Sequence, residues 1–339
     1  MSFLESPTWN QKTRMSLEAL IEKGAGKSHL AVFDFDNTIV CGDIGEATLA
    51  VLARDRIIEK ESIPAVLSPD FIGFEGEKIS LHDCVDLTAY YESLLASSAH
   101  QQDPTPLSSG YVWAVEIMQG LRIRDVISAT AEAMRDSEPL QEKHITVTEG
   151  KTSYPIPFFY PEMIELLNTL IEHDFDVWIV SATNVWTVRW LVRNRLNPLL
   201  PKKGIAPEKV IGVSTLLQDR QNYLYKDHLL VHADRDYAAL EEKRISELEL
   251  TAKINFPVST YTGKVACIMD FIGKRPFLAA GDSPGDHPML RYSKHKLWIA
   301  RVEKSDYQTQ THRLIDIDGD PEKWLFQSVR CKKTPGFFS

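Results

Sequence analysis

Cysteine is scarce in this chain of 339 residues, and its four cysteines, Cys41, Cys84, Cys267 and Cys331, are widely spaced. No two of them form a CxxC pair, and none has histidine partners at zinc-finger spacing. The spacing therefore argues against a cysteine-based zinc site and against a disulfide framework. We expect reduced thiols, as in a cytoplasmic protein.

Long apolar runs are also absent. No stretch reaches the roughly eighteen apolar residues that a membrane-spanning helix needs, so membrane insertion is not expected. Residues 1–14 do not combine a basic segment with an apolar one, so no secretory signal is predicted. Both absences lead to the expectation of a soluble, cytoplasmic protein.

Positive charge is in deficit: 38 Lys and Arg residues face 47 Asp and Glu residues, and the net charge is -9. Basic residues gather only in the pair Lys202 and Lys203 and in a short C-terminal cluster, which we interpret as solvated surface. A nucleic-acid partner is not expected, because binding to a phosphate backbone needs a concentrated positive field. Hydrophobic residues at 43% and charged residues at 25% are ordinary for a folded protein, and the length suggests about two domains.

Apolar, strand-like segments alternate with amphipathic helical segments along much of the chain. Strands are predicted at 29–36, 175–181 and 276–282. Helices are predicted at 11–24, 162–173 and 185–196. This alternation is typical of an α/β protein with a doubly wound parallel sheet.

Two insertions interrupt the alternation. Residues 45–154 carry long helical patterns and are predicted to form a helical cap domain, while residues 1–44 and 155–339 form the core. A second, smaller insertion lies around 214–260. Within it we predict a short hairpin at 222–233 and a helix near 237–250.

Asp34 and Asp36 follow the first predicted strand in the motif Asp-Phe-Asp-Asn-Thr. Ligands of open α/β sheets bind beyond the carboxyl ends of the strands, so these acids are candidates for catalysis. Asp34 can attack phosphorus as a nucleophile, while Asp36 protonates the leaving oxygen and later deprotonates water. On their own, two acids at a strand end could also solvate a loop or cap a helix.

Ser181 and Lys264 extend the pattern at later strand and helix ends. The Ser181 hydroxyl and the backbone N–H of Ala182 can bind a phosphate at a helix N-terminus, although such a serine can also be a plain N-cap. A lysine is unfavourable at the start of a helix, where the dipole is positive. We therefore interpret Lys264 as a partner of Asp34 and of the phosphoryl group, with a solvated lysine as the alternative. The apolar positions of its helix are Cys267, Ile268, Phe271 and Ile272.

Asp282 and Asp286 complete the set in the loop Gly-Asp-Ser-Pro-Gly-Asp, which follows the third predicted strand. Carboxylates four residues apart in a tight loop provide the oxygen ligands that Mg²⁺ prefers, together with substrate phosphate and water. A simple turn is the alternative. The four pieces in this order favour a phosphoryl-transfer site that binds Mg²⁺.

Together these four motifs resemble those of the haloacid dehalogenase (HAD) superfamily. The resemblance covers the predicted core and implies a Rossmann-like phosphatase in which Asp34 becomes an aspartyl-phosphate and Asp36 is the general acid and base. It also implies that Mg²⁺ is held by Asp34, by the backbone carbonyl of Asp36 and by Asp282, with Asp286 in support. The acid at position 36 argues against the dehalogenase branch, which lacks it.

A cap inserted directly after the first motif resembles the phosphoserine phosphatase group of that superfamily. A narrower likeness, to bacterial phosphorylcholine phosphatases, rests on residues 42–47 and on aromatic residues of the cap. Asp43 and Glu46 are therefore candidates for binding a substrate amine. The aromatic residues are candidates for a cage around a quaternary ammonium, and they are Tyr90, Tyr91 and Trp113. Solvated acids and cap packing are the alternative interpretations.

The expected function is the Mg²⁺-dependent hydrolysis of a small phosphorylated substrate, with phosphocholine, phosphoethanolamine and phosphoserine as candidates. Two alternatives are open at this point: a phosphomutase that returns the phosphoryl group to its substrate, and a non-catalytic binding protein on the same fold. A cap that closes over the site would limit the size of the substrate. The sequence predicts no particular protein partner.

Overall fold

The computed structural model of the chain describes residues 3–73, 75–99, 110–200, 204–226 and 245–339. Its centre is a seven-stranded sheet in the order β16-β15-β14-β13-β1-β8-β9, in which all neighbours are parallel except β15 and β16. The strands are β1 Leu30–Phe33, β8 Asp176–Asn184, β9 Val210–Val213, β13 Leu278–Gly281, β14 His295–Arg301, β15 Trp324–Arg330 and β16 Gly336–Phe337. The predicted α/β class with a mostly parallel sheet is confirmed.

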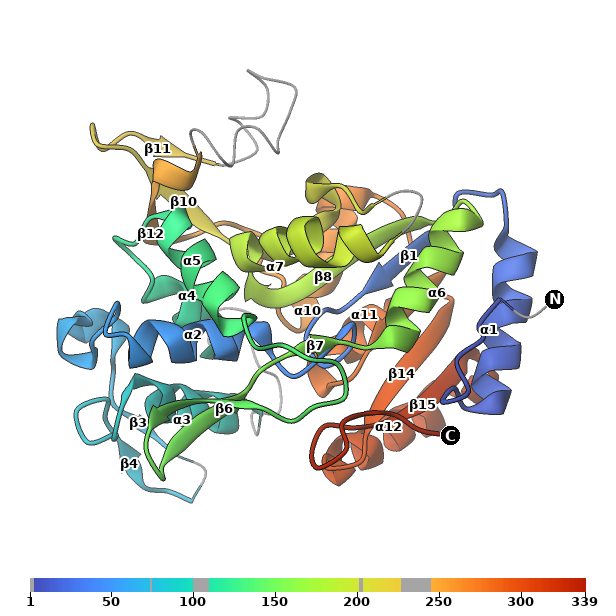
Figure 1. Cartoon of the computed structure of the whole chain (residues 1–339), viewed down its shortest axis with the longest axis horizontal. Coiled ribbons are helices and arrows are strands. Elements are labelled where there is room, and N and C mark those ends of the chain that lie inside the picture. Colours follow the sequence, from blue (N-terminus) through green and yellow to red (C-terminus); the bar gives the residue numbers. More distant parts are fainter. Residues whose placement is uncertain (1–2, 74, 100–109, 201–203, 227–244) are drawn as a thin grey trace.

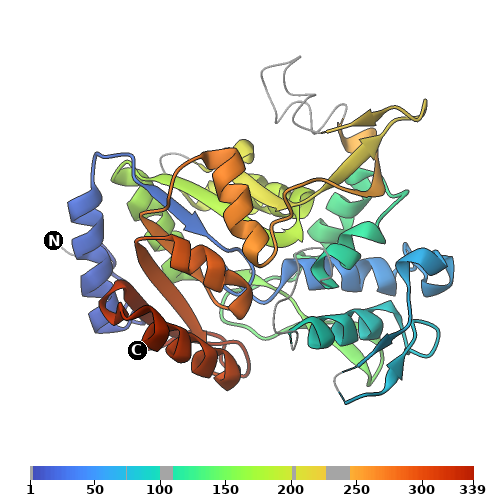
Figure 2. The same ribbon diagram turned by 180° about the vertical axis from the view of Figure 1, so that it is seen from behind.

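Helices cover both faces of this sheet (Figure 1, Figure 2). Side chains alternate along a strand, so Ala31 and Phe33 of β1 pack on one face while Leu30 and Val32 pack on the other. A fully buried Val, Leu or Phe side chain stabilises a fold by about 1.5–3 kcal/mol. The first face is covered by α1 (Gln11–Gly24), α6 (Pro161–Glu172) and α7 (Val185–Leu191), and the second by α10 (Thr262–Cys267), α11 (His287–Tyr292) and α12 (Ser305–Asp318).

One helical face differs from the prediction. The spacing after Lys264 predicts that Phe271 faces the core, but Phe271 is 52% exposed. After Cys267 the helix continues as a π-helical turn at Ile268–Ile272. This wider winding rotates later side chains relative to a period of 3.6 residues. Cys267 itself, before that change, is fully buried as predicted.

The cap begins and ends at a short strand pair that we call the stem. β2 (Val40–Cys41), where the chain leaves the core, pairs antiparallel with β7 (Phe158–Phe159), where it returns. The described residues between them form four α-helices, α2 Ile44–Arg54, α3 Leu87–Ala99, α4 Gly110–Glu116 and α5 Ile123–Ala133. Two hairpins that the sequence does not predict accompany them, β3–β4 (Phe71–Ile72 and Lys78–Ile79) and β5–β6 (His144–Thr148 and Thr152–Pro155).

The second insertion contains a three-stranded sheet of β10 (Thr215–Gln218), β11 (Leu224–Tyr225) and β12 (Glu249–Ile254). The predicted hairpin at 222–233 and the predicted helix near 237–250 both extend into residues 227–244, which lie outside the described part. The described end of that helix prediction is wrong, because Ile245–Glu247 is a 3₁₀ turn and Glu249 begins β12. Pairing with β10 outweighs the charged, helix-favouring local sequence there.

Backbone hydrogen bonds join this second insertion to the cap. The N–H of Gly120 donates to the carbonyl of Leu250 (2.8 Å), and the N–H of Ile123 donates to the carbonyl of Leu248 (3.1 Å). Both views show the insertion sheet beside α4 and α5, at one side of the core (Figure 1, Figure 2). Cap and insertion are therefore physically continuous, although they are far apart in the sequence.

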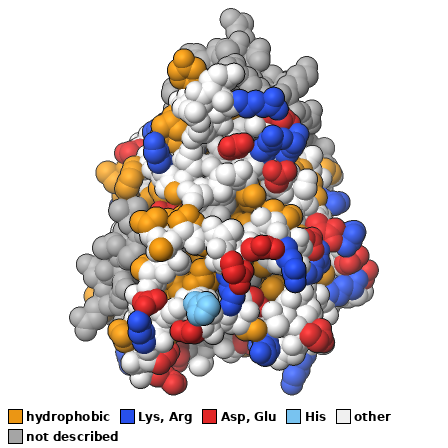
Figure 3. All heavy atoms as spheres, turned by 90° about the vertical axis from the view of Figure 1, so that its left-hand side faces the viewer, with side chains coloured by type: hydrophobic (Ala, Val, Ile, Leu, Met, Phe, Trp, Pro, Cys, Tyr) orange, Lys and Arg blue, Asp and Glu red, His pale blue; other side chains and the backbone are white. Residues whose placement is uncertain are grey.

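The end of the molecule formed by the cap and the insertion carries charges of both signs. Figure 3 shows Lys and Arg side chains interspersed with Asp and Glu on the described part of this face, with hydrophobic areas between them. Within the part of the chain that the structure describes, no helix combines the length and apolar character required to cross a bilayer.

Asp86 ties two parts of the cap together. Its carboxylate accepts hydrogen bonds from Thr88 and Ala89 at the start of α3 and from Thr148 and Thr152 of the β5–β6 hairpin. Partial burial raises the pKa of Asp86, but the hydrogen bonds from the threonines outweigh it and leave the pKa below its ordinary value. The ionised carboxylate therefore stabilises the folded cap.

Replacing Asp86 by alanine is expected to lower the free energy of unfolding by about 2 kcal/mol, because a helix cap and charge-assisted hydrogen bonds are lost together. Urea unfolding of the full chain measures this change. Asp83→Ala, an exposed substitution three residues earlier, is the matched control and should change stability by less than about 0.5 kcal/mol. Equal effects of the two substitutions would contradict the role of Asp86.

Candidate active site

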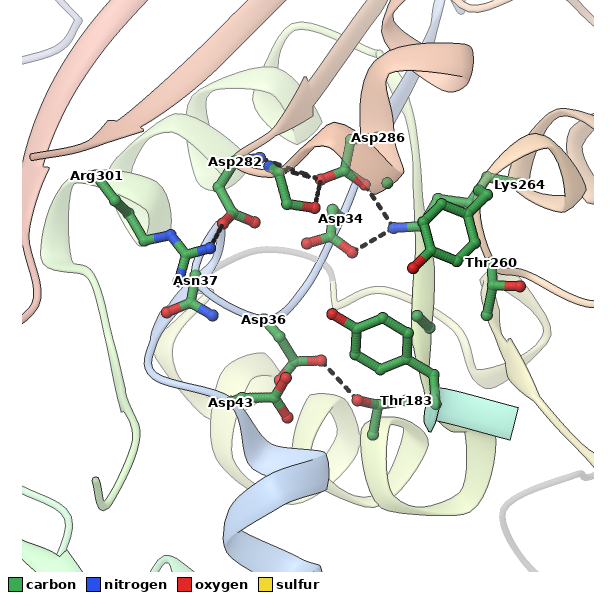
Figure 4. A pocket seen from close by; sticks show the side chains of 15 residues that line it. Asp34, Asp36, Asn37, Asp43, Thr183, Thr260, Lys264, Asp282, Asp286 and Arg301 are labelled. Atoms are coloured by element: carbon green, nitrogen blue, oxygen red, sulfur yellow. Dashed lines mark hydrogen bonds and ion pairs between the residues drawn. The ribbon is translucent and has the colours of Figure 1, made fainter. Parts of the chain in front are cut away.

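Four neighbouring strands of the core, β8, β1, β13 and β14, end at one edge of the sheet, and residues at their ends line a single pocket (Figure 4). The pocket encloses about 460 Å³, including the part open to solvent. The structure brings together in this pocket seven predicted residues, Asp34, Asp36, Asp43, Ala182, Lys264, Asp282 and Asp286.

The chain turns sharply just after Asp34. The N–H of Asp34 still donates to the carbonyl of Ala280 in β13 (3.0 Å), whereas the carbonyl of Phe35 already accepts from the N–H of Ile39 (2.8 Å). Asn37 has φ +56°, in the left-handed region that asparagine tolerates better than most residues. Phe35 is fully buried, and the acids on either side of it reach different parts of the pocket (Figure 4).

Lys264 links the nucleophile candidate to the acidic loop. Its ammonium nitrogen lies 2.6 Å from Asp34 Oδ1 and 2.6 Å from Asp286 Oδ1, and its side chain is only 3% exposed. Burial alone would lower the pKa of Lys264, but the two carboxylates raise it above its ordinary value. The lysine is therefore charged. Thr38 adds a hydroxyl that donates to Asp34 Oδ2 (3.2 Å).

Asp286 organises the loop after β13. Its Oδ2 accepts from the N–H of Asp282 (3.1 Å) and from the N–H and the hydroxyl of Ser283 (3.2 Å each). Gly281 is required before this loop, because a Cβ there would lie 2.5 Å from the Cβ of Asp286. Asp286 therefore positions Asp282 as well as Lys264.

Asp36 is held by three hydrogen-bond donors. The N–H of Ile44 donates to its Oδ1 (2.7 Å), and the hydroxyls of Thr183 (2.7 Å) and Ser181 (3.2 Å) donate to its Oδ2. Burial raises the pKa of Asp36 well above its ordinary value, and the charge of Asp43 raises it further. The protonated form is thereby favoured, which suits a group that must give a proton to a leaving oxygen.

The two predicted phosphate-binding residues of β8, Ser181 and Ala182, have different surroundings. The Ser181 side chain is fully buried and turned to Asp36, and its oxygen accepts from the N–H of Thr183 (3.0 Å). Ala182 and Thr183 line the pocket. The phosphate-binding role of Ser181 stays a prediction, and the hydrogen bonds of its side chain in the structure support the general acid instead.

Acids outnumber cations in this pocket. The acids are Asp34, Asp36, Asp43, Asp282 and Asp286, against Lys264 and Arg301. Burial is the main reason why the pKa of Asp34 lies well above its ordinary value, and the charge of Asp286 adds to it. Burial also raises the pKa of Asp282 to about 6, although Arg301 opposes this shift. A bound cation would relieve this excess of negative charge.

Three of the acids could hold a divalent metal ion. One ligand oxygen from each of Asp34, Asp282 and Asp286 lies within 4.8 Å of the others, and all three residues are buried. Asp282 Oδ2 receives no well-directed hydrogen bond, although a nitrogen of Arg301 lies 2.7 Å away. Such hard oxygen donors fit Mg²⁺. The Asp36 carboxylate is outside this cluster, so only its backbone carbonyl is left for the predicted metal role.

Arg301 is a pocket residue that the sequence analysis misses. It is the last residue of β14, and its guanidinium carbon lies 5.5 Å from the ring centre of Tyr307. Its Nε is buried without a hydrogen-bond partner among the described residues. The signal is present in the sequence, since a charged residue ends an apolar strand here just as Asp34 and Asp282 do.

Asp43 and Glu46 lie at the start of α2, the first cap helix. Asp43 caps this helix, because its Oδ1 accepts from the N–H of Glu46 (2.9 Å), and it lines the pocket. Glu46 is partly exposed, and desolvation followed by the charge of Glu92 raises its pKa to about 7. Gly45 lets α2 approach closely, since a Cβ there would lie 2.7 Å from the hydroxyl of Thr183.

The three predicted cage residues pack against one another in the cap, since the ring centre of Trp113 lies 5.1 Å from that of Tyr90 and 6.4 Å from that of Tyr91. Tyr91 is buried, and burial followed by the charge of Glu46 raises its pKa, so it belongs to the surroundings of that acid. Tyr90 and Trp113 donate to backbone carbonyls of the cap. Tyr111, which the sequence-based site does not include, lines the pocket. The cation cage stays a prediction.

These features define a class of protein. A parallel core carries two acids two residues apart after its first strand, a buried lysine and an acidic loop at the same edge, and a cap inserted after the first motif. This arrangement resembles that of the HAD-type phosphatases, which hydrolyse phosphoric monoesters.

Comparisons with known proteins agree with this class. The chain is 27% identical over 325 residues to a phosphorylcholine phosphatase of Pseudomonas aeruginosa, and the match covers 93% of this chain and 86% of that protein. No family model matches the chain. The resemblance that the motifs predict is confirmed.

One solved structure shares the fold, and a second is more distantly similar. A conserved protein of unknown function from Anaerococcus prevotii has a TM-score of 0.67 at 19% identity, over 100% of this chain and 97% of that one. A HAD family hydrolase from Salmonella enterica serovar Typhi has a TM-score of 0.40 at 12% identity, over 88% of this chain and 73% of that one. The first of these shows that the whole architecture, cap and insertion included, occurs in another protein.

The excess of buried acids predicts how stability depends on pH when metal is chelated. The pKa of Asp282 is raised from 3.8 to about 6, and that of Glu46 from 4.5 to about 7. Between these values the folded protein binds more protons than the unfolded chain does. The free energy of unfolding in chelator is therefore expected to fall as pH rises from about 4 to about 7.

Urea unfolding at several pH values measures this dependence. Asp34→Asn removes one of the repelling charges and should make the decline shallower, whereas Asp316→Asn, an exposed change on α12, should leave it unaltered. Stability that instead rises over this pH window would show that Lys264 and Arg301 already compensate the acids.

Proposed function

We propose that this enzyme hydrolyses a small phosphomonoester that carries an ammonium group, with the help of Mg²⁺ and through a phosphorylated Asp34. The observation that carries the proposal is the position of Asp34. It is buried at the end of β1, bound by Lys264 on one oxygen, and it lines the same pocket as Asp36. A nucleophile and a proton donor are thereby available to one substrate.

Each step of the proposed hydrolysis can be assigned to particular side chains. A carboxylate oxygen of Asp34 forms a bond to phosphorus while the bond from phosphorus to the leaving oxygen breaks, and Asp36 gives that oxygen its proton. Asp36 then takes a proton from a water molecule that attacks the phosphorylated Asp34, and inorganic phosphate leaves. Lys264 holds the nucleophile in place and compensates negative charge on the transferring group.

Asp34, Asp282 and Asp286 would hold the Mg²⁺, since their oxygens converge and carry charge that the protein itself does not balance. When bound, the ion supplies positive charge for the phosphoryl oxygens and for the acids around them. Asp286 also bonds Lys264 and the loop backbone, so its main contribution is to position Asp282.

A substrate that carries an ammonium group is supported by the charges on the cap side of the pocket. Asp43, Glu46 and Glu92 lie together, since Glu46 raises the pKa of Asp43 and Glu92 raises that of Glu46 after the larger effect of burial. Tyr154 fixes Glu92, because its hydroxyl donates to the carboxylate (2.6 Å). An ammonium group would be attracted to these acids while its phosphate lies at Asp34. The similarity to a phosphorylcholine phosphatase supports phosphocholine or phosphoethanolamine as the substrate.

Asp34→Asn is expected to abolish release of inorganic phosphate from every substrate, because the amide cannot form the covalent intermediate. Asp36→Asn should act selectively. It is expected to lower kcat for phosphoethanolamine, whose alkoxide leaving group needs a proton, by about 10²–10⁴, and to have a much smaller effect with p-nitrophenyl phosphate. Steady-state assays with Mg²⁺ and with chelator measure both.

The exposed variant Asp316→Asn serves as the control and should retain full activity. Turnover by Asp34→Asn would refute the assignment of the nucleophile. Transfer of the phosphoryl group to a sugar phosphate, with no free phosphate released, would identify a phosphomutase instead.

Glu46→Gln is expected to raise KM for phosphocholine about tenfold, because one charge facing the ammonium is lost, and to leave KM for the uncharged p-nitrophenyl group unchanged. In the wild type this discrimination should weaken as pH falls below about 7, where Glu46 becomes protonated. Steady-state kinetics with both substrates between about pH 5.5 and about pH 8 test this expectation, because these limits lie roughly one unit or more on either side of that pKa.

Glu149→Gln, an exposed change in the β5–β6 turn of the same cap, is the matched control. Equal increases in KM for both substrates would mean that Glu46 supports the pocket structurally and does not recognise the cation.

A further inference from the structure

Three side chains that the catalytic proposal does not use meet where the cap joins the core. Cys41 ends strand β2 of the stem, Tyr160 follows strand β7 of the stem, and Cys331 follows β15. The Tyr160 hydroxyl lies 3.8 Å from the Cys331 sulfur. Cys41 and Tyr160 belong to one core cluster against which Cys331 packs, and each of the two thiols changes the pKa of the other. Each of the two chain segments of the stem therefore contributes a residue, Cys41 or Tyr160, that meets Cys331 at the end of β15.

The two thiols differ in accessibility. Cys41 is 5% exposed and Tyr160 is fully buried, whereas Cys331 is partly exposed. The Cys41 side chain is the main cause that lowers the pKa of Cys331, and the charge of Arg301 lowers it further despite burial. Cys331 is thus the thiol that solvent reaches and that ionises first, with Cys41 behind it.

We propose that Cys41 and Cys331 form a reversible disulfide that fastens the stem of the cap to the core sheet. A small-molecule disulfide, such as oxidised glutathione, is the oxidant. The Cys331 thiolate attacks one of its sulfurs and releases the first small thiol. Cys41 then gives up its proton, attacks the Cys331 sulfur of the mixed disulfide and releases the second small thiol. Two protein thiols are oxidised and one small disulfide is reduced.

The proposed disulfide would join the stem to a fixed part of the core. β15 lies inside the central sheet, between β14 and β16, and the N–H groups of Cys331 and Lys332 both donate to Glu303 (2.9 and 3.1 Å). Cys331 is therefore fixed to the core. Gly42, next to Cys41, has φ +92° and is the first residue beyond the stem strand. A disulfide would immobilise the stem one residue before this flexible point and so restrict movement of the cap.

The test uses the full chain, reduced and then incubated with oxidised glutathione without phosphate substrate. Mass spectrometry of peptides is expected to show a Cys41–Cys331 crosslink, and the number of titratable thiols should fall from four to two. This readout is independent of the proposed function. The second readout rests on it: kcat for p-nitrophenyl phosphate is expected to fall about tenfold and to recover with a thiol reductant.

Cysteine variants distinguish the proposed disulfide from oxidation of other thiols. Cys331→Ser, at the partly exposed position, should abolish both the crosslink and the loss of activity, and Cys41→Ser should do the same. Cys84→Ser, a partly exposed thiol of the cap, should behave as the wild type. A stable glutathione adduct on Cys331 without a crosslink would overturn the proposal. A crosslink that leaves kcat unchanged would overturn the fastening of the cap while the disulfide itself stands.

Discussion

The contact between Lys264 and the two buried carboxylates of Asp34 and Asp286 is the one on which the rest of the site depends. One ammonium group, through two contacts of 2.6 Å, fixes the end of β1, the loop after β13 and the start of α10 relative to one another. Removing one partner of such a buried pair typically destabilises a protein by about 3–5 kcal/mol, because a buried charge is left uncompensated. Asp34, the proposed nucleophile, is therefore held in place by a contact that is costly to break.

The same contact leaves the pocket with more negative charge than the protein balances. Burial raises the pKa values of Asp34 and Asp36, the negative charges around them raise these values further, and the result serves opposite needs at the two acids. At Asp34 it makes a bound cation favourable, since the cation restores the ionised nucleophile. At Asp36 it favours the protonated form that a general acid requires. Because the N–H of Ile44 in the first cap helix donates to Asp36, the state of the acid also depends on the position of the cap.

The sheet edge and most of its acids could be predicted, because parallel strands with helices on both sides must be apolar and their polar ends stand out. Asp34 and Asp282 stand out by that contrast, whereas Lys264 stands out because it lies near a helix start, where the dipole disfavours a cation. Arg301 carries the same signal as the two acids but ends a fourth strand that the prediction did not include. Thr183 was missed because β8 continues three residues beyond Ser181, to Asn184. The join between cap and insertion could not be predicted, since it is made by backbone groups that any sequence provides.

Two of the attachments between the cap and the core limit how the cap can move. One attachment is the stem, and the other is the insertion sheet, which pairs with the cap and returns to the core at Ser259. The hydroxyl of Ser259 donates to the carbonyl of Ser181 (2.6 Å), so the chain is anchored again only five residues before Lys264. A cap that opens must carry the insertion sheet with it and bend the short connection between β12 and Ser259. Opening is therefore coupled to the lysine side of the site, which favours substrates small enough to enter without a wide displacement.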